Sequence, residues 1–231
     1  HGTVSQLGFL VLVTGFGTRD AALAGVALLT AHALFKSALF LVVGIVDHAA
    51  GTRDWRKLSG LGRRMPVVAT IGFVAAASMA GVPPLLGFVA KEGVFTSLLE
   101  AGTATADGGP AAGWGWLALV LAFLGSVLTV AYSVRFVWGA FWTRPNCAPT
   151  PLHREPAMVA ASPAVLAAAS LVAAFTITLI EPLYTSYADE LPGPEEYHLA
   201  LWHGLEPALW LSFAVFALGA LLVWGRAKVA R

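Results

Sequence analysis

The stretch 21–46 reads AALAGVALLTAHALFKSALFLVVGIV, with Lys36 near its middle and His32 four residues earlier. A helix crosses the hydrocarbon part of a bilayer with ~20 residues, so this stretch is long enough to span a membrane. A charge at mid-depth is costly unless it is paired, neutralised or solvated, and membrane chains rarely keep one without a use for it. The first hypothesis is therefore that Lys36 handles protons or ions inside a membrane.

The composition places the whole chain in the membrane class. Of its 231 residues, 58% are hydrophobic and 12% are charged, whereas a soluble domain carries ~25% charged residues. A formal net charge of +1 argues against nucleic-acid binding, which needs a clustered basic face. The single cysteine, Cys147, excludes an intramolecular disulfide. The chain starts at His1 without the charged n-region of a signal peptide, and we expect it to be a piece of a longer protein.

Continuous apolar stretches recur along the chain and predict an all-α, polytopic membrane protein with about seven transmembrane helices. They cover residues 4–16, 21–46, 66–82, 84–100, 114–143, 157–181 and 205–225. A strand barrel is not expected, because its segments alternate between apolar and polar residues. Between the third and fourth stretches, Pro83 and Pro84 interrupt the helical hydrogen bonding. Either two spans meet there in a tight turn, or a broken helix lies at membrane depth.

Charged loops give an orientation with one conflict. Residues 51–65 hold five basic residues and one acid, so the positive-inside rule places this loop in the cytoplasm. Counting spans forward puts 101–113 inside and 144–156 outside, although Arg144 and Arg154 belong to the second of these loops. A miscounted span near Pro83-Pro84 would remove the conflict.

His32 and Lys36 are the first candidate site. Their spacing of four places them on one face of a helix, about 6 Å apart along its axis. Burial disfavours the charged form of a lysine, and histidine titrates near physiological pH, so the two are predicted to translocate protons. The alternatives are a structural lysine that snorkels or pairs with an acid, and a core imidazole with satisfied hydrogen bonds.

The second candidate site is the stretch 81–92, GVPPLLGFVAKE. Transporters place ion sites at breaks in helices, and Lys91 is predicted to translocate protons at this break. Glu92 points in a different direction from Lys91 and is a possible member of the proton path. The alternative is a solvated ion pair at a helix end.

Asp47 and His48 close the stretch 21–46. They are possible path residues because a route from Lys36 to the cytoplasm passes near them, and a solvated helix end is the alternative. No nucleotide loop, haem motif, cysteine cluster or catalytic triad is present in the sequence, so we expect neither a cofactor nor a metal site.

Three motifs resemble the antiporter module shared by complex I and the Mrp cation/proton antiporters. They are TVSQLG at 3–8, AHALFKSALF at 31–40 and GVPPLLGFVAKE at 81–92. VDHAAGTRD at 46–54 and LWHG at 201–204 are more similar to the large A subunit of the Mrp antiporters than to complex I subunits. The resemblance covers nearly the whole chain.

The resemblance implies a fragment from the second half of that subunit. Residues 1–143 would form the second of two inverted repeats, with a broken helix near Pro83-Pro84. Residues 144–231 would form the following transmembrane helices, with an acidic loop at about 181–206. Lys36 matches the family's lysine on the central polar axis, and His32 a histidine often found one turn away. Lys91 matches the ionisable residue at the second broken helix, the proposed exit toward the outside.

The function implied is that of a subunit of a multisubunit Na⁺/proton antiporter in a bacterial plasma membrane. It would be a secondary transporter and not an enzyme, with other subunits, lipid, protons and Na⁺ or another monovalent cation as partners. The fragment alone is not expected to transport. One alternative is a proton-pumping membrane-arm subunit of an NADH:quinone oxidoreductase or a membrane hydrogenase. Another is a membrane scaffold whose charges are vestigial.

Overall fold

Helices build the whole regular structure of the described residues, which confirms the expected all-α class. The computed structural model describes residues 2–52, 54–103, 112–143, 150–153, 156–193 and 197–229. The helices are α1 (Gly2–Thr14), α2 (Arg19–Ala50), α3 (Leu61–Arg64), α4 (Pro66–Ala80), α5 (Leu86–Thr103), α6 (Ala112–Phe141), α7 (Ala161–Phe175), α8 (Ile177–Ala188) and α9 (Pro207–Val229), with 3-10 turns at Trp55–Lys57 and Ala157–Ala160.

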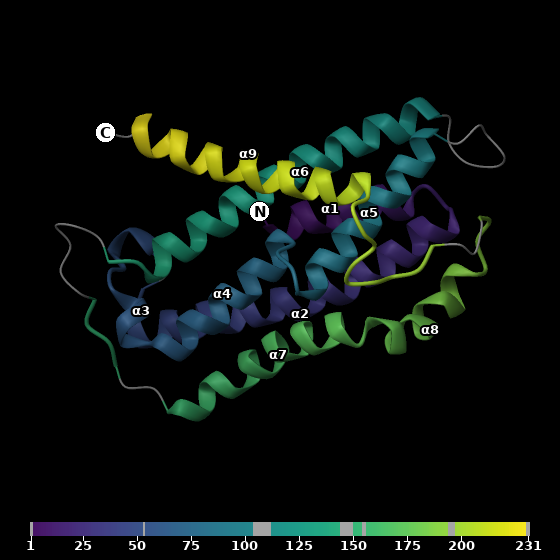
Figure 1. The fold of residues 1–231 in the computed structure, drawn as a ribbon. Coiled ribbons are helices and arrows are strands. Elements are labelled where there is room, and N and C mark those ends of the chain that lie inside the picture. The colour runs from purple at the N-terminus through teal and green to yellow at the C-terminus, as the bar shows by residue number, and fades with distance from the viewer. Residues whose placement is uncertain are drawn as a thin grey trace.

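Helix α2 is the longest element, and α1, α4, α5, α7 and α8 pack against it (Figure 1). The side chain of Thr18 caps its start by accepting a hydrogen bond from the Ala21 N–H, and Gly51 ends it in a left-handed conformation at φ 65°. Its 32 residues extend for about 48 Å at 1.5 Å per residue. The helix is therefore longer than a hydrocarbon core of about 30 Å.

Helices α4 and α5 are two halves of one broken crossing. Gly81 ends α4 at φ 86°, and Pro83 and Pro84 cannot donate the next helical hydrogen bonds. Gly72 of α4 lies against Val42 near the end of α2, whereas Gly93 of α5 lies against Ala24 near its start. Because α2 is continuous, α4 and α5 must follow one another along it, as Figure 1 shows. A tight turn between two separate spans is thus wrong.

The broken crossing corrects the expected topology. Helix α6 starts beside the end of α5, where Gly115 meets Ala101, and returns to the basic loop, where Gly62 meets Phe141. The Thr150 N–H donates to the Ser59 carbonyl, and the His153 N–H to the Ala49 carbonyl. Residues 150–153 therefore lie beside loop 51–65, at what we call the basic end, and the expectation that 144–156 is outside is wrong.

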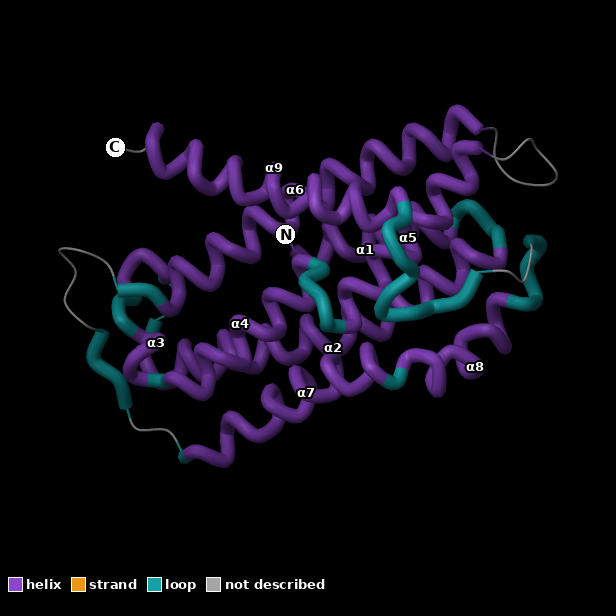
Figure 2. The backbone as a smooth tube through the Cα atoms, in the orientation of Figure 1, coloured by secondary structure: helices purple, strands orange, loops and turns teal. Residues whose placement is uncertain are grey.

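This correction removes the conflict with the positive-inside rule. Arg144 and Arg154 lie outside the described residues, but the chain next to them is at the basic end. The opposite end of the bundle holds the start of α2, the end of α5 and the loop between α8 and α9 (Figure 2). With the basic end in the cytoplasm, this opposite end faces outward.

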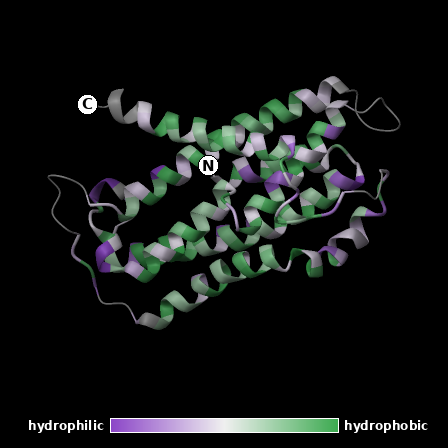
Figure 3. Ribbon diagram, viewed as in Figure 1, coloured by the Kyte–Doolittle hydropathy of each residue, from purple (hydrophilic) through white to green (hydrophobic). Residues whose placement is uncertain are grey.

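The apolar stretches of the sequence all occur as helices, coloured mainly as hydrophobic in Figure 3. Within the described residues, four helical segments are long and apolar enough to cross a membrane, namely Arg19–Ala50, Gly113–Phe141, Met158–Phe175 and Pro207–Gly225. Gly2–Thr14 and Pro66–Ala80 are shorter apolar helices. The stretch 157–181 is interrupted at Thr176, where α7 gives way to α8. Since α4 and α5 share a crossing, the seven stretches make fewer than seven separate spans.

Two small residues lock the break in place. A Cβ on Gly87 would stand 1.8 Å from the Ser78 carbonyl oxygen, so only glycine allows α5 to pass this close to α4. The Ser78 hydroxyl also shares a hydrogen bond of 2.9 Å with the Ser170 hydroxyl of α7. Both hydroxyls lie in residues at most 1% exposed, so this hydrogen bond joins α4 to α7 in the apolar interior.

We expect Gly87→Ala to destabilise the assembled protein, because the added methyl group meets a backbone oxygen that cannot rotate away. The cost expected for such overpacking is about 1–3 kcal/mol, visible as lower yield and a lower melting temperature of the detergent-purified complex. Gly44→Ala is the matched control, since nothing lies within 4 Å of its added Cβ. Equal melting temperatures for the two variants would contradict the tight approach at Gly87.

Candidate functional site

Lys36 and His32 lie midway along α2, both half-buried. The Lys36 Nζ atom is 2.8 Å from the point that a Cβ on Gly2 would occupy, so the first residues of α1 cover it. The same Nζ atom is 5.9 Å from the centroid of the Phe40 ring. The His32 and Phe35 rings meet in a T-shaped arrangement, with 5.4 Å between their centroids. Among the described residues, the buried His32 Nδ1 atom has no hydrogen-bond partner.

Polar groups of α1 and α6 surround the Lys36 amine. The Tyr132 hydroxyl is 3.7 Å from the same Gly2 point, so this hydroxyl and the Lys36 Nζ atom flank the start of α1 together. The Gln6 side chain, 1% exposed, donates to the Tyr132 hydroxyl at 3.4 Å and to the Thr129 hydroxyl at 3.4 Å. Side chains of lysine, tyrosine, glutamine and threonine thus gather between three helices.

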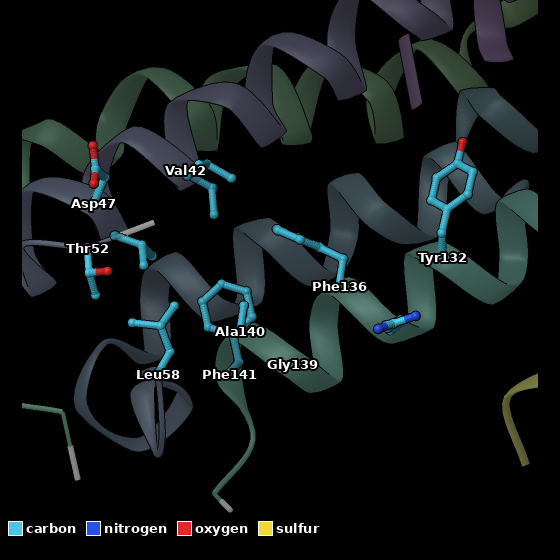
Figure 4. Close-up of a pocket in the computed structure, with 12 residues that line it drawn as sticks. Val42, Asp47, Thr52, Leu58, Tyr132, Phe136, Gly139, Ala140 and Phe141 are labelled. Carbon is cyan, nitrogen blue, oxygen red and sulfur yellow. The ribbon is translucent and has the colours of Figure 1, made fainter. Parts of the chain in front are cut away.

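A cavity of about 370 Å³ leads away from this cluster toward the basic end. Tyr132 and Arg135 line one part of it, and Asp47 and Thr52 line another. Figure 4 shows Asp47 and Tyr132 at opposite extremes of the labelled lining residues, with Phe136 between them. The structure therefore joins the Lys36 cluster to Asp47 by open space, whereas His48, next in sequence, is exposed on α2.

Lys91 belongs to α5, and its side chain reaches back to the break at the end of α4. It is 5% exposed, and its Nζ atom donates to the Ala80 carbonyl at 3.0 Å. That carbonyl would normally accept from the N–H four residues later, but this position is Pro84, which has no N–H. The proline therefore leaves an acceptor inside the bundle, and Lys91 uses it.

Glu92 is also buried, with 2% exposure. Its Oε2 atom is 3.8 Å from the Nδ1 atom of His203, which belongs to the loop between α8 and α9. A solvated Lys91–Glu92 pair at a helix end is thus wrong, because both side chains are buried and each has a different partner.

Sequence reasoning missed the polar face of α6. Ser126, Thr129 and Ser133 are at most 3% exposed, and Tyr132 belongs to the same part of the helix. The spacing of three and four residues between these hydroxyls in an otherwise apolar helix was the available signal. The role of Gln6 as a link between α1 and α6 also required the fold, because its partners lie more than 120 residues away.

Comparisons with known proteins agree with this architecture. Residues 1–107 match the transmembrane family described as NADH:quinone oxidoreductase/Mrp antiporter. Over 95% of its length, the chain is 36% identical to the A subunit of the Na⁺/H⁺ antiporter of Bacillus subtilis strain 168. Over 96% of its length, it is 34% identical to the A1 subunit of the Na⁺/H⁺ antiporter of Staphylococcus aureus strain JH9. The chain spans 30% of the length of each of these relatives.

A solved structure gives the same result in three dimensions. The fold superposes on a chain of the Mrp complex from Dietzia sp. DQ12-45-1b with a TM-score of 0.82 and 41% sequence identity. The match covers 99% of this chain and 24% of the other. Residues 1–107, which carry every sequence-predicted site residue, therefore belong to the transmembrane family shared by NADH:quinone oxidoreductase and the Mrp antiporters.

Proposed function

We propose that this chain is part of the large A subunit of a multisubunit Na⁺/proton antiporter, and that it moves protons through Lys36, His32 and Lys91. The observation that carries the proposal is the placement of the Lys36 amine beside Tyr132, a residue that also lines the cavity reaching Asp47. Relatives named as antiporter subunits support a transporter over an enzyme. Residues 1–143 would be the repeat that carries the path, and 144–231 the helices that follow it.

The path begins at the basic end. A proton taken up near Asp47 passes through water in the cavity to the Tyr132 hydroxyl and then to the Lys36 amine. Half-burial disfavours the charged ammonium, so Lys36 releases the proton when another positive charge approaches it. The Gln6 amide, which also donates to the Thr129 hydroxyl, holds Tyr132 in position during this exchange. His32 lies one turn closer to the start of α2 and receives the proton next.

Lys91 is the next group toward the outer face. Within the described structure, its amine makes one hydrogen bond, to a carbonyl, while an ammonium has three N–H donors. A neutral amine is therefore easily accommodated at this site, and a proton arriving there is readily lost again. Positive charge on His32 or Lys36 repels positive charge on Lys91 in the apolar interior. This repulsion provides a means to couple successive protonations, and partner subunits would link it to the cation.

The family description also names NADH:quinone oxidoreductase, so the experiment must separate a Na⁺/proton antiporter from a redox-driven proton pump. Everted membrane vesicles that carry the full subunit with its partners would be given a pH gradient. Collapse of the gradient on addition of Na⁺ supports the antiporter. Pumping driven by NADH or hydrogen oxidation, without a response to Na⁺, would place the chain in a redox-linked complex.

We expect Lys36→Ala to abolish the Na⁺-dependent collapse of the pH gradient, because alanine cannot take up the proton that the proposed path delivers to the Lys36 amine. Lys57→Ala is the control, since Lys57 is an exposed lysine of the basic loop. The two vesicle preparations would be matched for complex content. If Lys36→Ala collapses the gradient as fast as its parent, Lys36 is structural and the scaffold alternative gains support.

Asp47→Asn tests the entry from the basic end. The amide of the asparagine cannot take up a proton as the Asp47 carboxylate can. Because a positioned acid–base group speeds proton transfer ~100-fold or more, we expect Na⁺/proton exchange to slow by about tenfold or more. Asp54→Asn is the matched control, because Asp54 is an exposed acid of the same end. Equal exchange rates in the two variants would show that protons do not enter along the Asp47 side of the cavity.

A further inference from the structure

The loop 189–206 is fastened to the transmembrane helices by buried polar contacts. Arg19, 4% exposed, donates through its Nε atom to the Asp189 carboxylate at 2.8 Å and through a terminal nitrogen to the Tyr197 carbonyl at 3.1 Å. Glu181 of α8 accepts a hydrogen bond of 2.8 Å from the Leu199 N–H. Figure 2 shows this loop running back across the bundle before α9 begins. The acidic residues Glu195 and Glu196 lie outside the described residues.

The fastened loop brings two side chains down to α5. The Tyr197 hydroxyl lies 3.1 Å from the point that a Cβ on Gly93 would occupy, so it reaches the residue next to Glu92. The Tyr197 ring stacks on the His203 ring, with 5.5 Å between the ring centroids and 16° between the ring planes. Glycine at 93 is what leaves room for this approach. The His203 imidazole is thereby held with its Nδ1 atom facing the Glu92 carboxylate.

Hydrogen bonding then fixes the proton count of the pair. The His203 Nε2 atom is 2.7 Å from the His198 carbonyl oxygen, which accepts only, so Nε2 carries a hydrogen. Within the described structure, the His203 Nδ1 and Glu92 Oε2 atoms are both buried without another hydrogen-bond partner. With no proton between them, two lone pairs would face each other in a buried site. One proton, on either atom, gives an attractive contact.

We propose that Glu92 and His203 share one transferable proton, and that this pair passes protons between Lys91 and the outer face. The inference rests on the proposed function and adds a relay residue, His203, from outside the family-matched residues 1–107. Glu92 directly follows Lys91 in the chain, at the start of the outward half of the broken crossing. The loop 189–206 is then part of the path and not only its cover.

The charges around the pair favour retention of its proton. The Glu92 carboxylate, through its contact with Nδ1, raises the pKa of His203, and Glu206 acts in the same direction. Burial, together with the carboxylates of Glu92, Asp20, Glu100 and Glu206, raises the pKa of Tyr197. Tyr197 is therefore neutral beside the pair. Because the His203 pKa is raised, the contact is complete below a pH of about 6.5 and weakens as pH rises through the raised value.

Two variants separate a proton relay from a structural contact. Glu92→Gln keeps an attractive polar contact, since the amide N–H points its hydrogen at the Nδ1 lone pair. His203→Asn places an amide nitrogen where Nδ1 stands, facing the carboxylate. Neither variant can pass a proton across the pair. Glu190→Gln is the control, because Glu190 is an exposed acid of the same loop.

Loop closure is measured independently of transport. Leu199 is fully buried, so a cysteine at this position is reached by reagents only when the loop opens. Leu199→Cys is introduced together with Cys147→Ser in the full complex. A membrane-impermeant maleimide added from the outer side then labels the cysteine in the open loop. Modification of the subunit's own peptide is read by mass spectrometry. In the parent protein we expect the introduced cysteine to be protected from the maleimide near pH 6 and to be labelled faster as pH rises. Each labelling rate is divided by the rate of a fully exposed cysteine at the same pH, because the thiol itself reacts faster at higher pH. In Glu92→Gln we expect labelling independent of pH.

The expected result is a fall in Na⁺-dependent exchange of about tenfold or more in both Glu92→Gln and His203→Asn. The introduced cysteine stays protected in both variants, and Glu190→Gln behaves like the parent. Closed variants that exchange at the parent rate would overturn the relay. Should the parent vesicles show no response to Na⁺, the proposed antiport fails, and the labelling experiment still decides whether the proton is shared. Labelling of the parent that does not change with pH would overturn the shared proton.

Discussion

The hydrogen bond from the Lys91 amine to the Ala80 carbonyl is the interaction on which the arrangement of the site depends. It exists because Pro84 cannot donate to that carbonyl as the fourth residue of a continuing helix would. The same break sends α4 and α5 along α2 one after the other, as two halves of a single crossing. An unpaired carbonyl in an apolar interior is costly, and a buried amine is costly without an acceptor. Each group therefore satisfies the other.

Helix α2 provides the second constraint. Its continuity aligns His32 and Lys36 on one face, while α1 and α6 supply the polar partners that a lysine at this depth requires. The small residue Gly2 lets the Lys36 amine and the Tyr132 hydroxyl approach the same point. The resulting cluster meets the cavity toward Asp47 on one side, and the break at Lys91 lies on the neighbouring pair of helices. Protonatable groups thus follow one another from the basic end to the outer end.

The outer end is built differently from the basic end. The residues that follow α8 return over α5, held by the buried guanidinium of Arg19 and the carboxylate of Glu181. A loop that only covered the helices would need no imidazole aimed at a buried carboxylate. In this structure His203 is aimed at Glu92, so a segment remote in sequence completes the environment of the broken helix. Residues after α6 therefore contribute to the site that the first 107 residues began.

The sequence by itself determined the helical membrane fold, the position of the break and the identities of Lys36, His32, Lys91, Glu92 and Asp47 as candidates. Such features depend on local hydropathy, on proline chemistry and on the cost of charge at depth, all of which are written in consecutive residues. The roles of these residues stay predictions until they are tested. Only the tertiary structure decided that α4 and α5 form one crossing, which reverses the expected side of loop 144–156. It alone placed Gln6 beside Tyr132 and His203 beside Glu92, because these contacts join segments separated by more than a hundred residues. Helix packing, unlike local hydropathy, sets which distant side chains meet.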